Sequence, residues 1–317
     1  MQSKGEKYVI DHYQNSKNMN PNPYQLQISP KTKLFNFFRR FFILIGFDKM
    51  LPTFTRHSSI NSLAGRLIPP NYLYGSQSIR RLSFEGINMK LDISDAVEHF
   101  TYYTFDEPAL QVLYKLVGPG MTIVDIGANI GATTLNMAKR VGATGKIFSF
   151  EPSPYNYQKA SNNISLNDFP NIQLINMGLG SQKATASLYN VNRNNRGMQR
   201  LLADDSKITS YDKTEVFIDT LDGCMESFEI PTPSLIKIDV EGYELKVLQG
   251  GQETLKKYKP TLFIELDDNN LKEQGSNAKA LVEFLLQLNY QVADAADGRP
   301  IDGTADFSHC HFDILCT

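Results

Sequence analysis

The segment VDIGANIG at 124–131 carries the residue types best suited to bind a ligand. Its apolar residues predict a buried strand, and ligands of open α/β sheets bind where such strands end. Gly127 and Gly131 let the backbone approach a ligand closely, and the Asp125 carboxylate can meet an ammonium group. Asn129 stands where dinucleotide-binding loops need a middle glycine, and no GK[ST] motif follows. The spacing therefore favours a cofactor without phosphate groups.

The second and third predicted strands end in further candidates. Glu151, in Phe-Glu-Pro at 150–152, is placed to hold a ribose diol by two charge-assisted hydrogen bonds. NAD sites use the same position, so Glu151 alone does not separate the two cofactors. Gly178, after the third strand, suits the approach of a planar base, although an ordinary turn explains it nearly as well.

Carboxylates cluster after the fourth predicted strand, in IKIDVEGYE at 236–244. We predict a site role for Asp239 and Glu241, because acids clustered at one strand end repel each other unless a positive group arrives. Glu244 is better explained by the positive end of the next helix. Glu265 ends the fifth strand, and we expect it across a cleft from Asp239.

Proton transfer has three candidate bases. Asp239 or Glu265 can take or relay a proton from an acceptor hydroxyl, and His99 is the rival, since a neutral imidazole suits pH 7. The alternative for His99 is a partly buried surface histidine. No metal site is predicted: Mg²⁺ between Asp239 and Glu265 would have only part of its ligand shell, and we interpret the residues His-Cys-His at 309–311 as strand.

The elements that must position these residues alternate between strands and helices. Buried strands separated by helices predict a Rossmann-like, doubly wound, mostly parallel sheet. After a hairpin at 79–93 and a helix at 107–117, we predict strands at 122–126, 146–150, 172–177, 235–240 and 261–266, helices at 133–141, 155–166, 244–257 and 278–288, antiparallel pieces at 184–191 and 215–218, and a last strand at 312–316.

In these motifs the sequence resembles the FkbM-type family of S-adenosylmethionine-dependent methyltransferases. VDIGANIG at 124–131, FEP at 150–152 and IKIDVEGYELKVLQG at 236–250 carry the resemblance, which covers roughly 80–317. It implies a class I methyltransferase fold that uses S-adenosylmethionine. It also implies that Glu151 takes the ribose hydroxyls, that the amino-acid end is lined by Asp125, Gly127, Asn129 and Gly131, and that Asp239, Glu241 and Gly242 lie at the methyl-transfer site.

We therefore expect methyl transfer to a hydroxyl of a sugar, glycan or other small natural product. The alternatives are an NAD-dependent oxidoreductase, opposed by Asn129, and a non-catalytic, membrane-associated adaptor with the same fold. The acceptor pocket is expected from variable segments at 94–106 and 190–213, the second of which is rich in asparagine and arginine.

Composition limits the partners and the compartment. The 317 residues carry 32 basic and 34 acidic side chains, a net charge of −2, so no global positive field favours nucleic acid. Three cysteines fit buried thiols in a reducing compartment. The polar start has no apolar leader region, so we expect a cytoplasmic protein with peripheral membrane contact as an option.

Residues 1–33 are predicted to be a mobile polar tail, 34–78 an N-terminal extension with an apolar helix, and 79–317 the methyltransferase domain. At 34–47 the helix would place Asn36, Arg39 and Arg40 on one narrow stripe and ten apolar residues around the rest. Such a helix either packs on the body or on a second subunit, as in a homo-oligomer, or lies in a membrane interface.

Overall fold

The computed structural model describes residues 30–55, 65–103, 108–190, 199–201 and 213–317. Nearly all of the predicted tail at 1–33 lies outside these ranges. So does most of the expected acceptor segment at 190–213.

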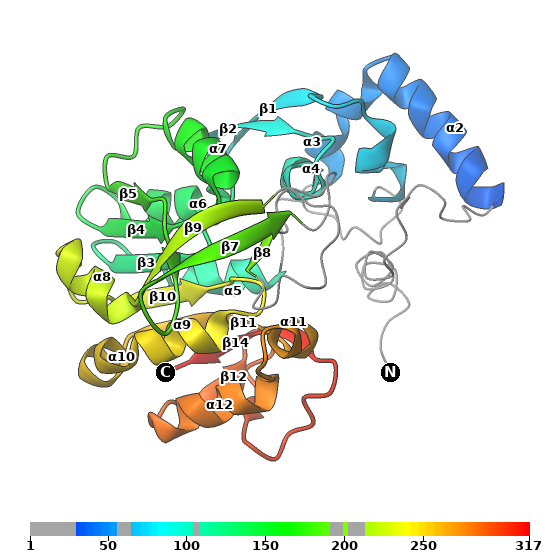
Figure 1. The fold of residues 1–317 in the computed structure, drawn as a ribbon. Coiled ribbons are helices and arrows are strands. Elements are labelled where there is room, and N and C mark those ends of the chain that lie inside the picture. The colour runs from blue at the N-terminus through cyan, green and yellow to red at the C-terminus, as the bar shows by residue number, and fades with distance from the viewer. Residues whose placement is uncertain (1–29, 56–64, 104–107, 191–198, 202–212) are drawn as a thin grey trace.

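A central sheet of eight strands forms the body of the protein (Figure 1). Five strands are parallel and β14 runs antiparallel to its neighbours β11 and β12. The sheet order is β5 (Ile172–Ile175), β4 (Lys146–Phe150), β3 (Thr122–Ile126), β10 (Leu235–Ile238), β11 (Thr261–Asp267), β14 (His311–Cys316), β12 (Val292–Asp294) and β13 (Pro300–Ile301). This order confirms the predicted Rossmann-like sheet, in which the fourth strand lies beside the first.

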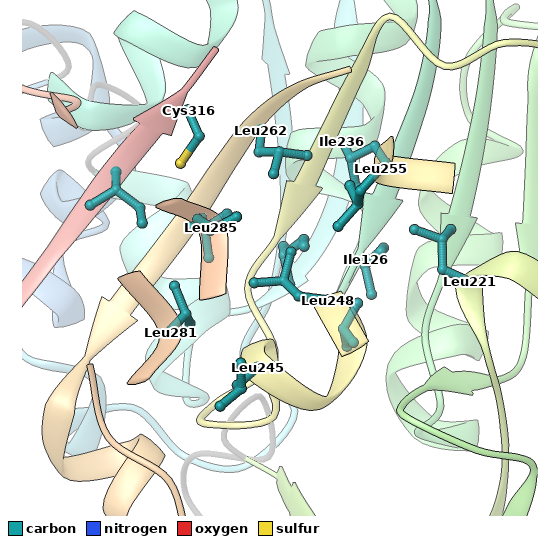
Figure 2. Close-up of a cluster of buried hydrophobic side chains, with 14 of the residues drawn as sticks. Ile126, Leu221, Ile236, Leu245, Leu248, Leu255, Leu262, Leu281, Leu285 and Cys316 are labelled. Atoms are coloured by element: carbon teal, nitrogen blue, oxygen red, sulfur yellow. The ribbon is translucent and has the colours of Figure 1, made fainter. Parts of the chain in front are cut away.

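The strands are buried on both faces, as their apolar runs predict. Val124 and Ile126 point to one face, where Figure 2 shows the larger core cluster with Leu248 and Leu262. Ile123 points to the opposite face and belongs to a second cluster.

Helices cover both faces of the sheet. On the side of the larger cluster lie α8 (Leu221–Ser227), α9 (Glu244–Gly250), α10 (Gln252–Tyr258), α11 (Asp268–Glu273) and α12 (Ala278–Gln287). On the other side lie α5 (Pro108–Leu116), α6 (Ala132–Val141) and α7 (Pro154–Ile164).

The predicted single helix at 244–257 was wrong, because the chain forms two helices, α9 and α10. They meet at Gly250 and Gly251, where the backbone bends. A Cβ atom on Gly250 would lie 1.9 Å from the Gly180 carbonyl oxygen, so this turn packs directly on the loop after β6. The glycines are needed for this close approach rather than for helix propensity.

A smaller sheet packs beside the central one. Its order is β6 (Gly178–Leu179), β9 (Lys213–Asp219), β7 (Ala184–Asn190) and β8 (Gln199–Leu201). The antiparallel pairing of β7 with β9 confirms the predicted antiparallel detour. This sheet has a small apolar cluster of its own, in which Leu188, Val216 and Ile218 are buried together.

The N-terminal part contains α2 (Pro30–Leu44), the short helices η3 (Phe47–Lys49), α3 (Leu51–Thr55), η4 (Gly65–Leu67) and η5 (Asn71–Leu73), the hairpin β1 (Ile79–Phe84) and β2 (Ile87–Asp92), and α4 (Ala96–Tyr103). The predicted hairpin is confirmed, with Phe84 paired to Ile87 across its turn. In the described ranges, no helix has the length and apolar character needed to cross a bilayer.

Two further predictions can be compared with the structure. The interpretation of residues 309–311 as strand was wrong for its first two residues, because β14 begins at His311 and His309 adopts a turn conformation with φ 59°. All three cysteines are free thiols; Cys224 and Cys316 are buried as expected, and Cys310 is half-buried.

Candidate functional site

The carboxyl ends of β3, β4, β10 and β11 bring most of the predicted site residues to one edge of the sheet. Lys237 pairs with Asp125 in the register of β10 and β3, and the next residues, Ile238 and Ile126, are also paired. The Asp239 amide then donates to the Ile126 carbonyl at 3.1 Å. Asp239 therefore lies beside the loop after β3, as predicted.

The loop after β3 is held in a conformation that requires glycine. Gly127 has φ 88°, and a Cβ atom there would lie 1.9 Å from the Asp239 carbonyl oxygen. Gly131 has φ 85° at the start of α6, and its added Cβ would lie 3.3 Å from Ala160. Asn129, between them, also has a positive φ of 50°. The loop thus brings its backbone close to the end of β10.

Glu151 links this loop to the end of β4. Its Oε2 accepts the Asn129 amide at 2.8 Å, and its Oε1 accepts the Ser153 amide at 2.9 Å. Burial raises the pKa of the Glu151 carboxyl to about 7, against the lowering effect of these hydrogen bonds. The Asn156 side chain also hydrogen-bonds to this carboxyl, and a carboxylate with about four acceptor sites then retains capacity for a further donor. Ribose binding by Glu151 stays a prediction.

Gly178 packs against Pro152, the residue that follows Glu151. A Cβ atom on Gly178 would lie 2.6 Å from Ile218 and 3.3 Å from Pro152. Close packing on these two side chains is thus one reason for glycine at this position. Contact between Gly178 and a base stays a prediction.

Lys237 is the residue that the sequence analysis missed. Its Nζ lies 2.9 Å from the Gly127 carbonyl oxygen, 3.2 Å from Asp239 Oδ2 and 3.6 Å from Asp125 Oδ1. Burial lowers the pKa of Lys237, but the carboxylates of Asp239 and Asp125 outweigh that effect and raise it above its usual value. This ammonium is the positive group that the clustered acids require. Its signal was a lysine inside a strand that is otherwise fully apolar and buried.

Asp125 lies beneath the loop rather than on its surface. Its side chain is fully buried, and its Oδ2 accepts the Thr134 hydroxyl at 2.6 Å. The same hydroxyl lies 3.1 Å from Ser149 Oγ, which continues the polar row across the sheet. In the structure Asp125 therefore joins Lys237 to the start of α6. Its predicted contact with a ligand's ammonium group stays a prediction.

Glu265 and Asp239 follow paired residues of adjacent strands, since Ile238 pairs with Ile264. The prediction that Glu265 ends its strand was wrong, because β11 continues to Asp267. The cleft expected between Glu265 and Asp239 stays a prediction. Burial raises the pKa of Glu265 well above its usual value, and the charges of Asp239 and Glu241 raise it further. Glu265 Oε1 also lies 3.9 Å from Nδ1 of the half-exposed His311. The strand end thus holds two acids with different environments.

The two other acids after β10 have separate partners. Glu241 Oε2 accepts the Asn270 side-chain amide at 2.9 Å, which ties the turn to α11. Gly242 has φ 99°, and a Cβ there would lie 2.3 Å from the Asn270 carbonyl oxygen. Glu244 Oε1 accepts the amides of Val240 and Gly242, both at 3.0 Å, at the start of α9. The structural interpretation of Glu244 is confirmed.

His99 lies in α4, in the N-terminal part of the chain. Its Nε2 is 2.8 Å from the Pro69 carbonyl oxygen, and its ring lies 4.8 Å from the Tyr103 ring. Burial lowers the pKa of His99 to about 4. Its described contacts belong to the N-terminal part, so they favour the interpretation as a partly buried histidine. The catalytic assignment of His99 stays a prediction that no contact supports.

Among the residues that the structure describes, no three His, Cys, Asp or Glu side chains are grouped so that they could hold a metal ion. At the end of β10, the positive charge beside Asp239 is the Lys237 ammonium.

The mostly parallel sheet, with the glycine loop and the acidic strand ends at its carboxyl edge, defines a Rossmann-like α/β protein of the class I methyltransferase type. Residues 125–292, just over half of the chain, match the sequence model of the family described as the methyltransferase FkbM domain. The chain therefore belongs to the FkbM methyltransferase family, and this favours methyl transfer over the oxidoreductase alternative.

Individual relatives are similar over parts of the chain. Methyltransferase 1 of Beauveria bassiana is 30% identical over 177 residues, which are 51% of this chain and 70% of that protein. The hexuronic acid methyltransferase AglP of Haloferax volcanii is 28% identical over 153 residues, 48% of this chain and 58% of that protein. The crystal structure of methyltransferase FkbM from Methylobacillus flagellatus is 18% identical with a TM-score of 0.40, and the match covers 70% of this chain and 52% of that one.

Proposed function

We propose that this methyltransferase uses S-adenosylmethionine and methylates a hydroxyl group of a sugar or related small molecule. One observation carries the proposal. The glycine loop after β3 contacts both Glu151 and the backbone of Asp239, so a cofactor-binding loop and an acidic reaction centre meet at one edge of the sheet.

The polar groups at this edge fit an adenosyl cofactor. Glu151 accepts one backbone amide on each oxygen and a further hydrogen bond from the Asn156 side chain, so a ribose hydroxyl can donate to the acceptor capacity that remains. The loop has glycine where side chains would block the approach, and no lysine cradle for phosphate is present in it. Asp239 is half-exposed at the end of β10 and adds negative charge where a sulfonium and an ammonium would lie.

The chemistry asked of the protein is alignment and proton removal. When bound, S-adenosylmethionine supplies a methyl group already activated on a sulfonium. The loop and Glu151 fix the nucleoside, and proximity supplies much of the rate gain. Asp239, held by Lys237, orients the acceptor hydroxyl, and Glu265 takes its proton as the general base.

The raised pKa of Glu265 suits this assignment. A carboxylate of ordinary pKa is a weak base at neutral pH, whereas one whose pKa is raised towards the working pH is a stronger base when ionised. The Lys237 ammonium next to Asp239 makes Asp239 the better group for holding the hydroxyl. Asp239 thus serves for orientation and Glu265 for proton transfer.

A sugar acceptor is supported by one relative whose name states its substrate, the hexuronic acid methyltransferase AglP, at 28% identity. Uronic acids carry several hydroxyls and a carboxylate. The stretch predicted to build the acceptor pocket at 190–213 contains Arg193, Arg196 and Arg200, which can bind such a carboxylate in bidentate fashion.

Two measurements test the proposal. Titration calorimetry with S-adenosylmethionine and with NAD should show binding of the first and not of the second; binding of NAD alone would overturn it. Radiolabelled methyl transfer to uronic acid and neutral sugar acceptors should then yield an ether stable to mild base. A base-labile product would place the methyl group on a carboxylate and contradict methylation of a hydroxyl.

A further inference from the structure

The helix α2 turns its apolar face away from the protein. Leu34, Phe37, Phe38 and Phe41 recur along α2 at the spacing that places side chains on one side of a helix, and Ile45, one residue after the helix, continues that spacing. All five are exposed, with 67% of Phe37 and 53% of Phe41 accessible, and Leu44 beside them is 82% accessible. Figure 1 shows α2 at the periphery, on the far side of the β1–β2 hairpin from the central sheet. We call this set of residues the α2 apolar face.

Hydrogen bonds on the opposite side hold the helix in this rotation. Asn36 is buried, and its side-chain amide donates to the Tyr72 hydroxyl at 3.0 Å. Arg39 donates to Asn36 Oδ1 at 3.1 Å and to the Arg66 carbonyl oxygen at 2.5 Å. Turning the apolar face inward would break these bonds and leave buried polar groups unpaired. The exposure of the aromatic side chains is therefore built into the packing of the helix.

Positive charge flanks the apolar face, at Lys33 and Arg40. Residues 30–55 contain five basic residues, Lys31, Lys33, Arg39, Arg40 and Lys49, whereas the whole chain has a net charge of −2. The single acid in this stretch, Asp48, is fully buried and paired with Arg80 at 3.1 Å. Lys33 and Arg40 are exposed and lie between the apolar face and the buried stripe. A surface that binds here must accept apolar side chains and carry negative charge.

We propose that α2 lies in the plane of an anionic lipid bilayer, with the α2 apolar face among the acyl chains and Lys33 and Arg40 at the level of the lipid phosphates. The 15 residues of α2 span about 22 Å, which is shorter than the apolar core of a bilayer but suits an in-plane helix. A second copy of the chain fits less well, because a two-fold contact through this face would bring two positively charged rims together. The inference is independent of the proposed reaction.

Flotation of the full chain with vesicles tests the proposal, without cofactor or acceptor. Binding is expected to vesicles of phosphatidylcholine with phosphatidylglycerol, to be at least about tenfold weaker with phosphatidylcholine alone, and to weaken in high salt. The triple variant Phe37→Ser/Phe38→Ser/Phe41→Ser should bind at least about tenfold more weakly. Lys33→Glu/Arg40→Glu should abolish the preference for anionic lipid while retaining the aromatic side chains.

The matched control is Leu166→Ser/Phe217→Ser, which removes two exposed apolar side chains elsewhere and should leave flotation unchanged. Circular dichroism and thermal unfolding establish that each variant folds. Equal flotation of the triple variant and the parent would overturn the proposal. So would a dimer that forms without lipid and is lost in the triple variant, because the second copy would then occupy the α2 apolar face.

Discussion

The Nζ atom of Lys237 lies 3.2 Å from Oδ2 of Asp239, so the acid at the candidate reaction centre is paired with a buried cation from its own strand. The same Nζ lies 3.6 Å from the fully buried Asp125. Lys237 therefore connects the cofactor loop, through Asp125 and the Gly127 carbonyl, with the acid after β10. The positive charge of Lys237 offsets the repulsion between the carboxylates that lie close together at this edge of the sheet.

Replacing Lys237 with Met should destabilise the protein by about 3–5 kcal/mol, since it leaves the Asp125 carboxylate buried without its cation. Urea unfolding measures this change. The double variant Lys237→Met/Asp125→Asn should recover much of the stability, because no buried charge then remains unpaired. A single variant as stable as the parent would show that the pair is not coupled.

Replacing Asp239 with Asn and Glu265 with Gln should separate orientation from proton transfer. Turnover in Glu265→Gln should fall roughly 10²-fold, the scale of a general base. In the parent, kcat/KM should rise with pH as the Glu265 carboxyl, whose pKa burial raises, becomes ionised; this rise should vanish in Glu265→Gln and persist in Asp239→Asn. His99→Phe should lose less than about tenfold. A larger loss there, with the rise kept in Glu265→Gln, would assign the base to His99.

The parts of the fold that depend on local patterns could be predicted from the sequence. The bounds of β3 and β4 agree with the structure, because short apolar runs ended by Gly127 and by Pro152 leave little choice. The pairing of β10 with β3 followed from the usual order of doubly wound sheets. These features require only burial, turn chemistry and chain topology.

Other features depend on contacts between distant segments. The division of α9 from α10 follows from the contact of Gly250 with Gly180, 70 positions earlier in the chain. The position of Lys237 between two carboxylates was visible only once β10 and β3 were adjacent. Likewise, the hydrogen bond of Asn36 to Tyr72 decides which side of α2 faces the body, and no helical pattern contains that information.

Glu151→Gln should weaken S-adenosylmethionine binding by roughly 10- to 100-fold, since a hydrogen bond to a charged group contributes about 1.5–3 kcal/mol. The amide has one acceptor oxygen in place of two, so one of the Asn129 and Ser153 amides also loses its partner. Calorimetry measures the affinity. Glu226→Gln, a change at the end of α8 outside the site, is the control and should bind as the parent does. Unchanged affinity in Glu151→Gln would remove the ribose role.

Glu244→Gln should change how stability depends on pH. Burial raises the pKa of Glu244 to about 7, above its ordinary value of 4.5, so the native state binds more protons than the unfolded chain between these two values. The parent should therefore lose stability as pH rises from below 4.5 through about 7, by on the order of 3 kcal/mol from this group. Glutamine can still accept the amides of Val240 and Gly242, and its variant should lack this loss. Parallel stability curves in urea from pH 4.5 to 8 would contradict the prediction.

Gly127→Ala should abolish cofactor binding, because the new Cβ would lie 1.9 Å from the Asp239 carbonyl oxygen and one of the two segments must move. Gly46→Ala is the matched control: its φ is also positive, at 74°, in the left-handed region, but nothing lies within 4 Å of the added Cβ. The control carries only the conformational cost of a positive φ, about 1 kcal/mol. Thermal unfolding and calorimetry of both variants separate this cost from the steric clash. Equal effects in the two variants would mean that the close approach of Gly127 to Asp239 does not hold the site together.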